Sequence, residues 1–318
     1  MSALAEVGIA ALPLRAGQLP LSDLIDLYMA NYAGRDTARV QRLTWWREQL
    51  GAVQLQDVSD DNIHAALEGL ARQPARFYAG KDVDGKPIHK TKGKPRAPAT
   101  LNRYSAAIAA VFTWSIRRRI APKGWVHPCR GIERQAENNE KTRFLSDDER
   151  QRLLEACKAS KYKRLYLLVL LALTTGGRRG ELIGLRWADV DFEHAVIHVG
   201  RSKNGDPKVL PLVPAVLDQM RLHQGAPGGL VFPSTRRPDV PYHFNPRWDE
   251  ALKVAKIRGF TFHGLRHSCA SYLAQNGASL LEIGDLLGHR QVSMTKRYSH
   301  LAASHRSALV NRVLGDIS

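Results

Sequence analysis

Between residues 20 and 120, apolar side chains recur three and four positions apart, which is the spacing of one face of an α-helix. The pattern predicts four helices, over residues 21–33, 36–51, 59–71 and 99–119. Ser59 is a favourable N-cap for the third helix, and Gly51 is a favourable residue to end the second. We therefore expect an all-α domain over residues 18–135, preceded by a loose tail of residues 1–17.

A strongly basic stretch separates the third and fourth of these helices. The segment "RFYAGKDVDGKPIHKTKGKPR" (76–96) holds seven basic and two acidic residues, with glycine and proline throughout. This composition predicts a loop, which we place at residues 76–98. A run of charge is most often only solvated, but a basic ribbon between two helices can also follow a DNA groove. The candidate DNA-binding residues of this segment are Lys90, Lys92, Lys94 and Arg96.

The fourth predicted helix ends in three arginines, Arg117, Arg118 and Arg119. Positive charge stabilises the C-terminus of a helix, which is sufficient to explain them. Contact with phosphate groups is the functional alternative, so the three arginines join the candidate DNA-binding set.

The second half of the chain has a mixed pattern. After a polar linker at residues 136–145, Ser146 and Glu149 have the spacing of a capping box that begins a helix. The apolar spacing then predicts a buried helix over residues 162–175, followed by a short one. Five more helices are predicted over residues 214–224, 246–256, 263–275, 279–288 and 303–315. Between them, "DVDFEHAVIHVG" and "KVLPLV" predict short strands joined by the turn "RSKNGDP". We expect an α-rich domain with a small antiparallel sheet over residues 146–318, and hence a mainly α (α+β) fold.

Charge and composition narrow the class of partner. The 47 lysines and arginines outnumber the 30 acidic residues, and a net charge of +17 attracts polyanions, of which nucleic acid is the commonest. The three cysteines are far apart in the sequence and form no CxxC pair, which argues against a disulfide framework or a cysteine-based zinc site. The longest apolar run, residues 165–173, is too short to span a bilayer, and the N-terminus lacks the basic segment of a signal peptide. We expect a soluble cytoplasmic protein that binds nucleic acid and no membrane.

Two glycines, two arginines and a glutamate follow the apolar run in "LALTTGGRRGEL" (171–182). Neither a P-loop nor a GxGxxG string is present, and the preceding segment is Leu-rich and helical, so a nucleotide-binding loop is disfavoured. Arg178 and Glu181 are three residues apart on one helical face. They form either an ordinary surface ion pair or an arginine that a carboxylate holds toward a phosphate.

Two later motifs add acid–base groups. In "TFHGLRHSCASYLA", His263, Arg266 and His267 lie within about one helical turn. The two histidines have the i, i+4 spacing of a zinc site, but residue 264 is glycine instead of the glutamate of HExxH, so a metal site is disfavoured. In "LLGHRQVSMTKRYSHL", His289 follows a glycine, and Tyr298 comes nine residues later. Alone, Tyr298 would be interpreted as a packing residue.

Taken together and in this order, "TGGRRGEL", "HGLRH" and "LGH" with a tyrosine nine positions on resemble the tyrosine recombinase, or phage integrase, family. The resemblance implies a DNA breaking–rejoining catalytic domain after a helical, SAM-like core-binding domain. It also implies that Arg178 and Arg266 bind the phosphate, that Glu181 orients Arg178, and that His289 donates a hydrogen bond to the phosphate. His263 would assist proton transfer at Tyr298, the nucleophile that forms a 3′-phosphotyrosine. The family takes its general acid from a hairpin lysine, for which Lys203 fits better than Lys208.

The resemblance further implies a site-specific recombinase that acts on double-stranded DNA as a homo-tetramer, without cofactor or metal. An integrase, excisionase or invertase of a mobile element is expected. The segment after Tyr298, with apolar Ala308, Leu309, Val313 and Leu314, predicts a helix that packs on its own domain or on a neighbouring subunit. With about 17 residues before the first helix, we expect no arm-binding domain. The alternatives are a type IB topoisomerase, which the "LGH" spacing and the helical N-terminal domain disfavour, and a non-catalytic DNA-binding regulator.

Overall fold

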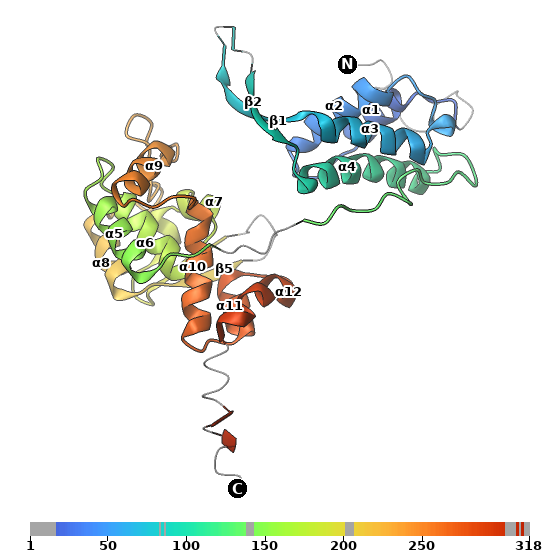
Figure 1. The fold of residues 1–318 in the computed structure, drawn as a ribbon. Coiled ribbons are helices and arrows are strands. Elements are labelled where there is room, and N and C mark those ends of the chain that lie inside the picture. The colour runs from blue at the N-terminus through green and yellow to red at the C-terminus, as the bar shows by residue number, and fades with distance from the viewer. Residues whose placement is uncertain are drawn as a thin grey trace. The chain divides into compact units, whose positions relative to one another are not determined.

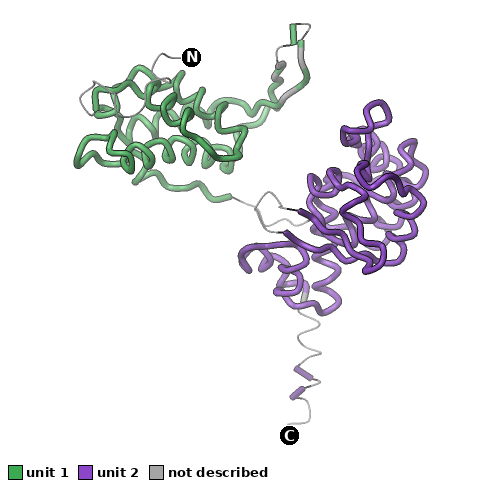
Figure 2. The backbone as a smooth tube through the Cα atoms, turned by 180° about the vertical axis from the view of Figure 1, so that it is seen from behind, with its two compact units in different colours: residues 1–138 green, residues 139–318 purple. Residues whose placement is uncertain are grey.

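The computed structural model divides the chain into two compact units, residues 1–138 (unit 1) and 139–318 (unit 2) (Figure 2). It describes residues 17–82, 84–85, 87–137, 143–200, 207–302, 310–311 and 313–314. Nearly all of the predicted tail, half of the linker, Lys203 and its turn, and most of the predicted C-terminal helix lie outside these described residues.

Unit 1 is built on four helices, which confirms the helices predicted there (Figure 1). They are α1 (Leu21–Ala30), α2 (Ala38–Leu50), α3 (Asp60–Arg72) and α4 (Pro98–Arg117), with a short 3₁₀ helix, η3 (Leu55–Asp57). The predicted N-cap is present, because the Ser59 hydroxyl accepts from the backbone of Asn62 in a capping box. The core centres on Trp46 and Phe112, both fully buried, and the Trp46 indole donates to the Tyr104 carbonyl at 2.9 Å. The apolar faces of the helices thus meet in one core.

The prediction of a loop at residues 76–98 was wrong. Strands β1 (Pro74–Lys81) and β2 (Pro87–Pro95) form an antiparallel hairpin, so unit 1 is not all-α (Figure 1). The glycines that suggested a loop mark its irregular points instead. Gly80 lies at a break in the strand register with φ +121°, and Gly85 closes the turn by donating to the Asp82 carbonyl at 3.1 Å. Aromatic and β-branched residues, which favour strands, occur among the lysines of both segments, and the overall composition does not reveal this pattern.

Unit 2 is helix-rich around a small sheet. Its helices are α5 (Asp147–Lys158), α6 (Leu165–Thr175), α7 (Arg179–Ile183), α8 (Pro214–Leu222), α9 (Asn245–Val254), α10 (Phe262–Gln275), α11 (Leu280–Leu287) and α12 (Val292–Thr295), with 3₁₀ helices η4 (Trp187–Asp189) and η5 (Lys296–Ala302). Strands β3 (Val190–Asp191), β4 (Val196–Val199) and β5 (Lys208–Pro211) pair antiparallel in that order. The mainly α fold with small antiparallel sheets is therefore confirmed.

Helix α6 is the centre of unit 2. Nearly all of its side chains are buried, which explains why its sequence is apolar all round instead of on one stripe. Helix α10 packs against α6, and η5 packs against α10. Within the described residues, every helix is too short or too polar to cross a membrane.

Candidate active site

Two features of the turn after α6 require glycine at position 176. Gly176 has φ +61°, in the left-handed region that favours glycine, and a Cβ there would lie 2.3 Å from Cδ2 of Leu287 in α11. The Thr175 hydroxyl accepts from the Gly177 amide at 3.2 Å and so supports the same turn. As a result, α6 ends abruptly, and Arg178 becomes the N-cap residue of α7.

The Arg178 guanidinium is held by its own helix, α7, and by the end of α11. Its Nη1 donates to Oε1 of Glu181 at 2.9 Å, and its Nη2 donates to the carbonyl of Gly288 at 3.2 Å. The other oxygen of Glu181 accepts from the Arg178 amide at 2.9 Å. The Arg178 side chain is 26% exposed, so it is anchored but still reachable from solvent.

Arg266 is the most deeply buried of the predicted site residues apart from the tyrosine, with 5% of its surface exposed. Its Nη1 donates to the carbonyl of Gly176 and its Nη2 to that of Leu287, both at 2.7 Å. Burial, together with the charge of Arg178, lowers the pKa of Arg266 to about 10, so the guanidinium remains charged at neutral pH.

The carbonyls that hold both arginines come from the C-terminal ends of α6 and α11. The last carbonyls of a helix have no partner within it and carry the negative end of the helix dipole. Two guanidinium groups satisfy these carbonyls here and are oriented by them. Gly288, like Gly176, ends its helix in the left-handed conformation, with φ +65°. The helix ends therefore provide a rigid frame for a pair of cations.

Glu181 also binds a lysine from the sheet. Nζ of Lys208, at the start of β5, lies 2.7 Å from Oε2 of Glu181, and the two side chains are only 10% and 8% exposed. Burial acts to raise the pKa of Glu181, but hydrogen bonds from Lys208 and Arg178 outweigh it and lower the pKa. Burial lowers the pKa of Lys208 despite this partner. Of the two candidate hairpin lysines, Lys208 thus lies in the site, and Lys203 lies outside the described residues.

Tyr298 lies in η5 with its side chain 1% exposed. Its hydroxyl is 2.6 Å from Nδ1 of His267, and burial raises the pKa of the phenol. His263, which we had assigned to this phenol, is exposed, and the described residues show no hydrogen bond between the two. Sequence reasoning gave no role to His267, although its i, i+4 spacing from His263 already placed both on one face of α10.

His289 follows Gly288 and faces the same group of cations. Its Nδ1 lies 2.8 Å from the hydroxyl of Thr295, and its amide donates to the Gly284 carbonyl at 2.9 Å. Burial and the charges of Arg266 and Arg178 lower the pKa of His289 to about 4, so its imidazole is neutral near pH 7. A neutral imidazole retains one N–H that it can donate to an anion.

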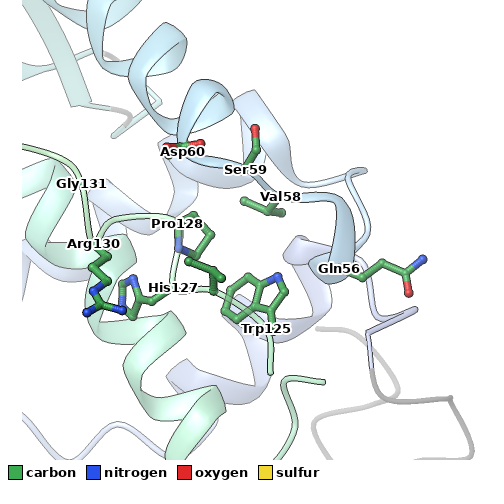
Figure 3. Close-up of a pocket in the computed structure, with 10 residues that line it drawn as sticks. Gln56, Val58, Ser59, Asp60, Trp125, His127, Pro128, Arg130 and Gly131 are labelled. Atoms are coloured by element: carbon green, nitrogen blue, oxygen red, sulfur yellow. The ribbon is translucent and has the colours of Figure 1, made fainter. Parts of the chain in front are cut away.

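The candidate DNA-binding residues all belong to unit 1. Lys90, Lys92 and Lys94 are exposed on β2, and the arginines at the end of α4 are exposed as well. Arg96 is half-buried and donates to the Gln73 side chain at 3.4 Å. Unit 1 also holds a cavity of about 480 Å³, lined by Trp125, His127 and the start of α3 among others (Figure 3). None of the predicted catalytic residues lines this cavity.

Among the described residues, no group of three or more His, Cys, Asp or Glu side chains is arranged to hold a metal ion. The site is instead a cluster of two arginines, a lysine, a carboxylate, three histidines and a phenol. Such a set can neutralise a phosphate and move protons at neighbouring oxygens.

Comparison with known proteins agrees with this chemistry. The model of the phage integrase family matches residues 143–305. The chain is 28% identical to the integrase of Salmonella phage P22 over 285 residues, which cover 83% of this chain and 71% of that protein. It is 29% identical to the shufflon-specific DNA recombinase of Escherichia coli over 228 residues, covering 70% of this chain and 56% of the relative.

A solved structure shares the fold over nearly the whole chain. The Tn1549 transposon integrase, solved in complex with a circular intermediate DNA, aligns with a TM-score of 0.69 over 92% of this chain and 99% of its own, at 17% identity. The family model covers the whole described arginine, histidine and tyrosine cluster. The chain therefore belongs to the phage integrase family and is a site-specific tyrosine recombinase.

Proposed function

We propose that this recombinase cleaves and rejoins DNA at specific sites of a mobile element through a 3′-phosphotyrosine intermediate. The observation that supports this best is the frame in which α6 and α11 hold Arg178 and Arg266, beside a tyrosine packed on α10. The P22 and shufflon relatives, named for integration and recombination, support the mobile-element role.

In the proposed reaction, the two guanidinium groups bind the non-bridging oxygens of one phosphodiester, and His289 donates a third hydrogen bond. Glu181 keeps Arg178 in its fork. Charge builds up on these oxygens as the phosphorus becomes pentacovalent, so the donors act most strongly in the transition state. Loss of one such donor typically costs roughly 2.7–4 kcal/mol.

The bonds exchange without net hydrolysis. Oη of Tyr298 forms a bond to phosphorus and gives up its proton, while the bond from phosphorus to the 5′-oxygen breaks. The departing 5′-oxygen takes a proton from a lysine, for which we propose Lys203. The phosphotyrosine conserves the energy of the phosphodiester, so a 5′-hydroxyl from a partner duplex can reverse the step and exchange strands. Four protomers on two DNA sites would complete the reaction.

Unit 1 would grip DNA with the hairpin. Alternate residues of a strand point to the same face, so Lys90 and Lys92 share one face of β2, and Lys94 follows an irregular point of the strand at Gly93. Phe77, 41% exposed, pairs with Lys90 and lies under the Lys92 ammonium at 5.8 Å. A row of exposed cations suits a phosphate backbone, and Arg117, Arg118 and Arg119, at the other end of the 20-residue α4, would contact phosphates separately. The Tn1549 integrase was solved with a circular intermediate DNA, which supports a DNA partner for this chain.

The test uses a nicked suicide duplex that carries the recombination site, because loss of the short cleaved strand traps the covalent intermediate. We expect the wild-type protein to give a slower-migrating band on a denaturing gel and Tyr298→Phe to give none. Absence of a band with the cognate duplex would contradict the proposal and favour a non-catalytic DNA-binding role. Efficient relaxation of a supercoiled plasmid that lacks the site would favour a topoisomerase instead.

A further inference from the structure

We propose that His267, and not His263, accepts the proton of the Tyr298 hydroxyl when the phenol attacks DNA. This inference rests on the proposed function, because it concerns the nucleophile of the same site.

The geometry favours His267. Its Nδ1 lies 2.6 Å from the phenol oxygen, a short distance that a proton crosses directly. The Tyr298 side chain is buried with only 1% exposed, so bulk water is not the ready acceptor for its proton. Within the described part of the chain, His267 is the side chain hydrogen-bonded to the phenol. His263 is exposed, and its ring packs edge-on to that of His267 at 5.0 Å between centroids.

The surroundings keep His267 neutral before the reaction. Burial, His263, Arg297 and Arg266 together lower the pKa of His267 to about 4, so the ring is neutral near pH 7. The groups that face the His267 ring are Tyr298 and Arg297 from η5 and His263 and Arg266 from its own helix. His289, which follows α11, also interacts with it electrostatically. The same cations make the ring a weak base in the free protein, and the negative charge of a phosphate bound by Arg178 and Arg266 would offset them and strengthen the base at Nδ1.

The step balances within the site. The Tyr298 Oη–H bond breaks as the Oη–phosphorus bond forms, and the proton moves to Nδ1 of His267. The imidazolium then lies beside the phosphotyrosine, so its added charge partly offsets that of the phosphate. When the 5′-hydroxyl of the incoming strand attacks, the bond from phosphorus to Oη breaks, and His267 returns the proton to Tyr298. His267 thus serves as base in cleavage and as acid in rejoining.

The test compares single-turnover adduct formation by wild type, His267→Asn and His263→Ala on the suicide duplex. The amide of Asn can occupy the position of Nδ1 and bind the phenol, but it does not take up a proton. Base catalysis typically contributes 10²–10⁴-fold, so we expect His267→Asn to lose about 100-fold in rate and His263→Ala to lose less. His194→Gln, on an exposed turn outside the site, controls for loss of a histidine. A band shift and a thermal melt establish DNA binding and folding for each variant.

The pH profile separates a base from a hydrogen-bond support. For the wild type we expect the rate to be flat from about pH 5.5 to about pH 8, because His267 is already neutral there. Without the base, the rate should rise about tenfold per pH unit, because the phenol must ionise first. A 5′-bridging phosphorothiolate, whose sulfur leaves without a proton, should restore cleavage by Lys203→Ala and leave His267→Asn impaired.

Two results overturn the inference. One is a His267→Asn rate within about threefold of wild type with a flat profile, which would return the proton to His263. The other is rescue of His267→Asn by the phosphorothiolate, which would assign His267 to the leaving group. In both cases Tyr298→Phe still abolishes the adduct, so the proposed function stands. If wild type itself forms no adduct, it is the proposed function that has failed.

Discussion

The cations of the two units are held in opposite ways. In unit 2, Arg178 and Arg266 are fixed by backbone carbonyls and by Glu181. In unit 1, Lys90 and Lys94 extend from a hairpin strand into solvent. Fixed guanidinium groups can match the oxygens of one phosphate at one position, whereas exposed lysines contribute a field that many phosphates share. In the function proposed above, positive charge would thus serve catalysis in unit 2 and DNA binding in unit 1.

Arg266→Ala should have the largest effect, because it should reduce cleavage while leaving DNA affinity nearly unchanged. We expect cleavage of the suicide duplex to fall by about 100- to 1000-fold, because one oxyanion donor is removed. DNA affinity in a band shift should change little, since the hairpin cations remain. Arg266→Lys keeps a charge without the fork that binds the Gly176 and Leu287 carbonyls, and it should recover only a small part of the rate. Cleavage by Arg266→Ala within tenfold of wild type would refute the fixed-cation interpretation.

Gly176→Ala should have the next largest effect, on the stability of unit 2. The substitution adds strain at φ +61° and places a methyl group against Leu287, so we expect the free energy of unfolding to fall by roughly 2–4 kcal/mol. Gly93→Ala in the hairpin is the matched control, because Gly93 has φ +62° with no atom within 4 Å of the added Cβ. Denaturant titration of both variants isolates the cost of the close approach. Equal losses would mean that the packing against Leu287 relaxes freely.

Glu181→Gln should have a smaller effect on cleavage. Gly288 still anchors Arg178, and hydrogen bonds to charged groups contribute roughly 1.5–3 kcal/mol, so we expect a loss of about tenfold. The effect on stability depends on pH. Because the folded-state pKa of Glu181 lies below its ordinary value of 4.5, the carboxylate stabilises the fold fully above that pH. This contribution is lost as pH falls through the lowered pKa.

Acid titration of stability checks that sign. The free energy of unfolding of the wild type should fall more steeply below about pH 4.5 than that of Glu181→Gln. Glu193→Gln, an exposed carboxylate on the turn between β3 and β4, serves as the control. Parallel curves for wild type and Glu181→Gln would show that the buried pair with Lys208 and Arg178 carries no pH-dependent stability.

Some elements of the fold follow from the local sequence pattern, and others depend on pairing that the pattern does not contain. The helices of unit 1, the N-cap at Ser59 and the capping box at Ser146 follow from local spacing, so they were predicted correctly. The hairpin does not follow from composition because glycine and proline favour a loop, whereas backbone pairing between β1 and β2 accommodates the glycines at bulges and a turn. Pairing between the two strands decides the structure here, and composition alone does not report that pairing.

The features of the candidate active site also divide into those that are local in sequence and those that depend on tertiary packing. The resemblance to the family implies that Arg178 and Arg266 act together, and a local ion pair between Arg178 and Glu181 follows from helix geometry. The anchoring of both arginines on the ends of α6 and α11 depends on how helices about a hundred residues apart pack, which no local pattern contains. The hydrogen bond between His267 and Tyr298 likewise depends on how η5 folds back onto α10.

The hairpin lysines should give the smallest effect for each residue changed. Replacing Lys90, Lys92 and Lys94 by Ala should weaken DNA binding alike on cognate and random duplexes and leave cleavage at saturating DNA unchanged. For each phosphate that a lysine no longer neutralises, the salt dependence of the logarithm of affinity should fall by about 0.9. Arg76→Ala is the matched control, since Arg76 pairs with Thr91 on the opposite face of the hairpin and should matter less. Equal weakening from the two faces would mean that the hairpin acts only through its net charge, whereas weakening confined to the lysine face would give the ribbon a defined orientation on DNA.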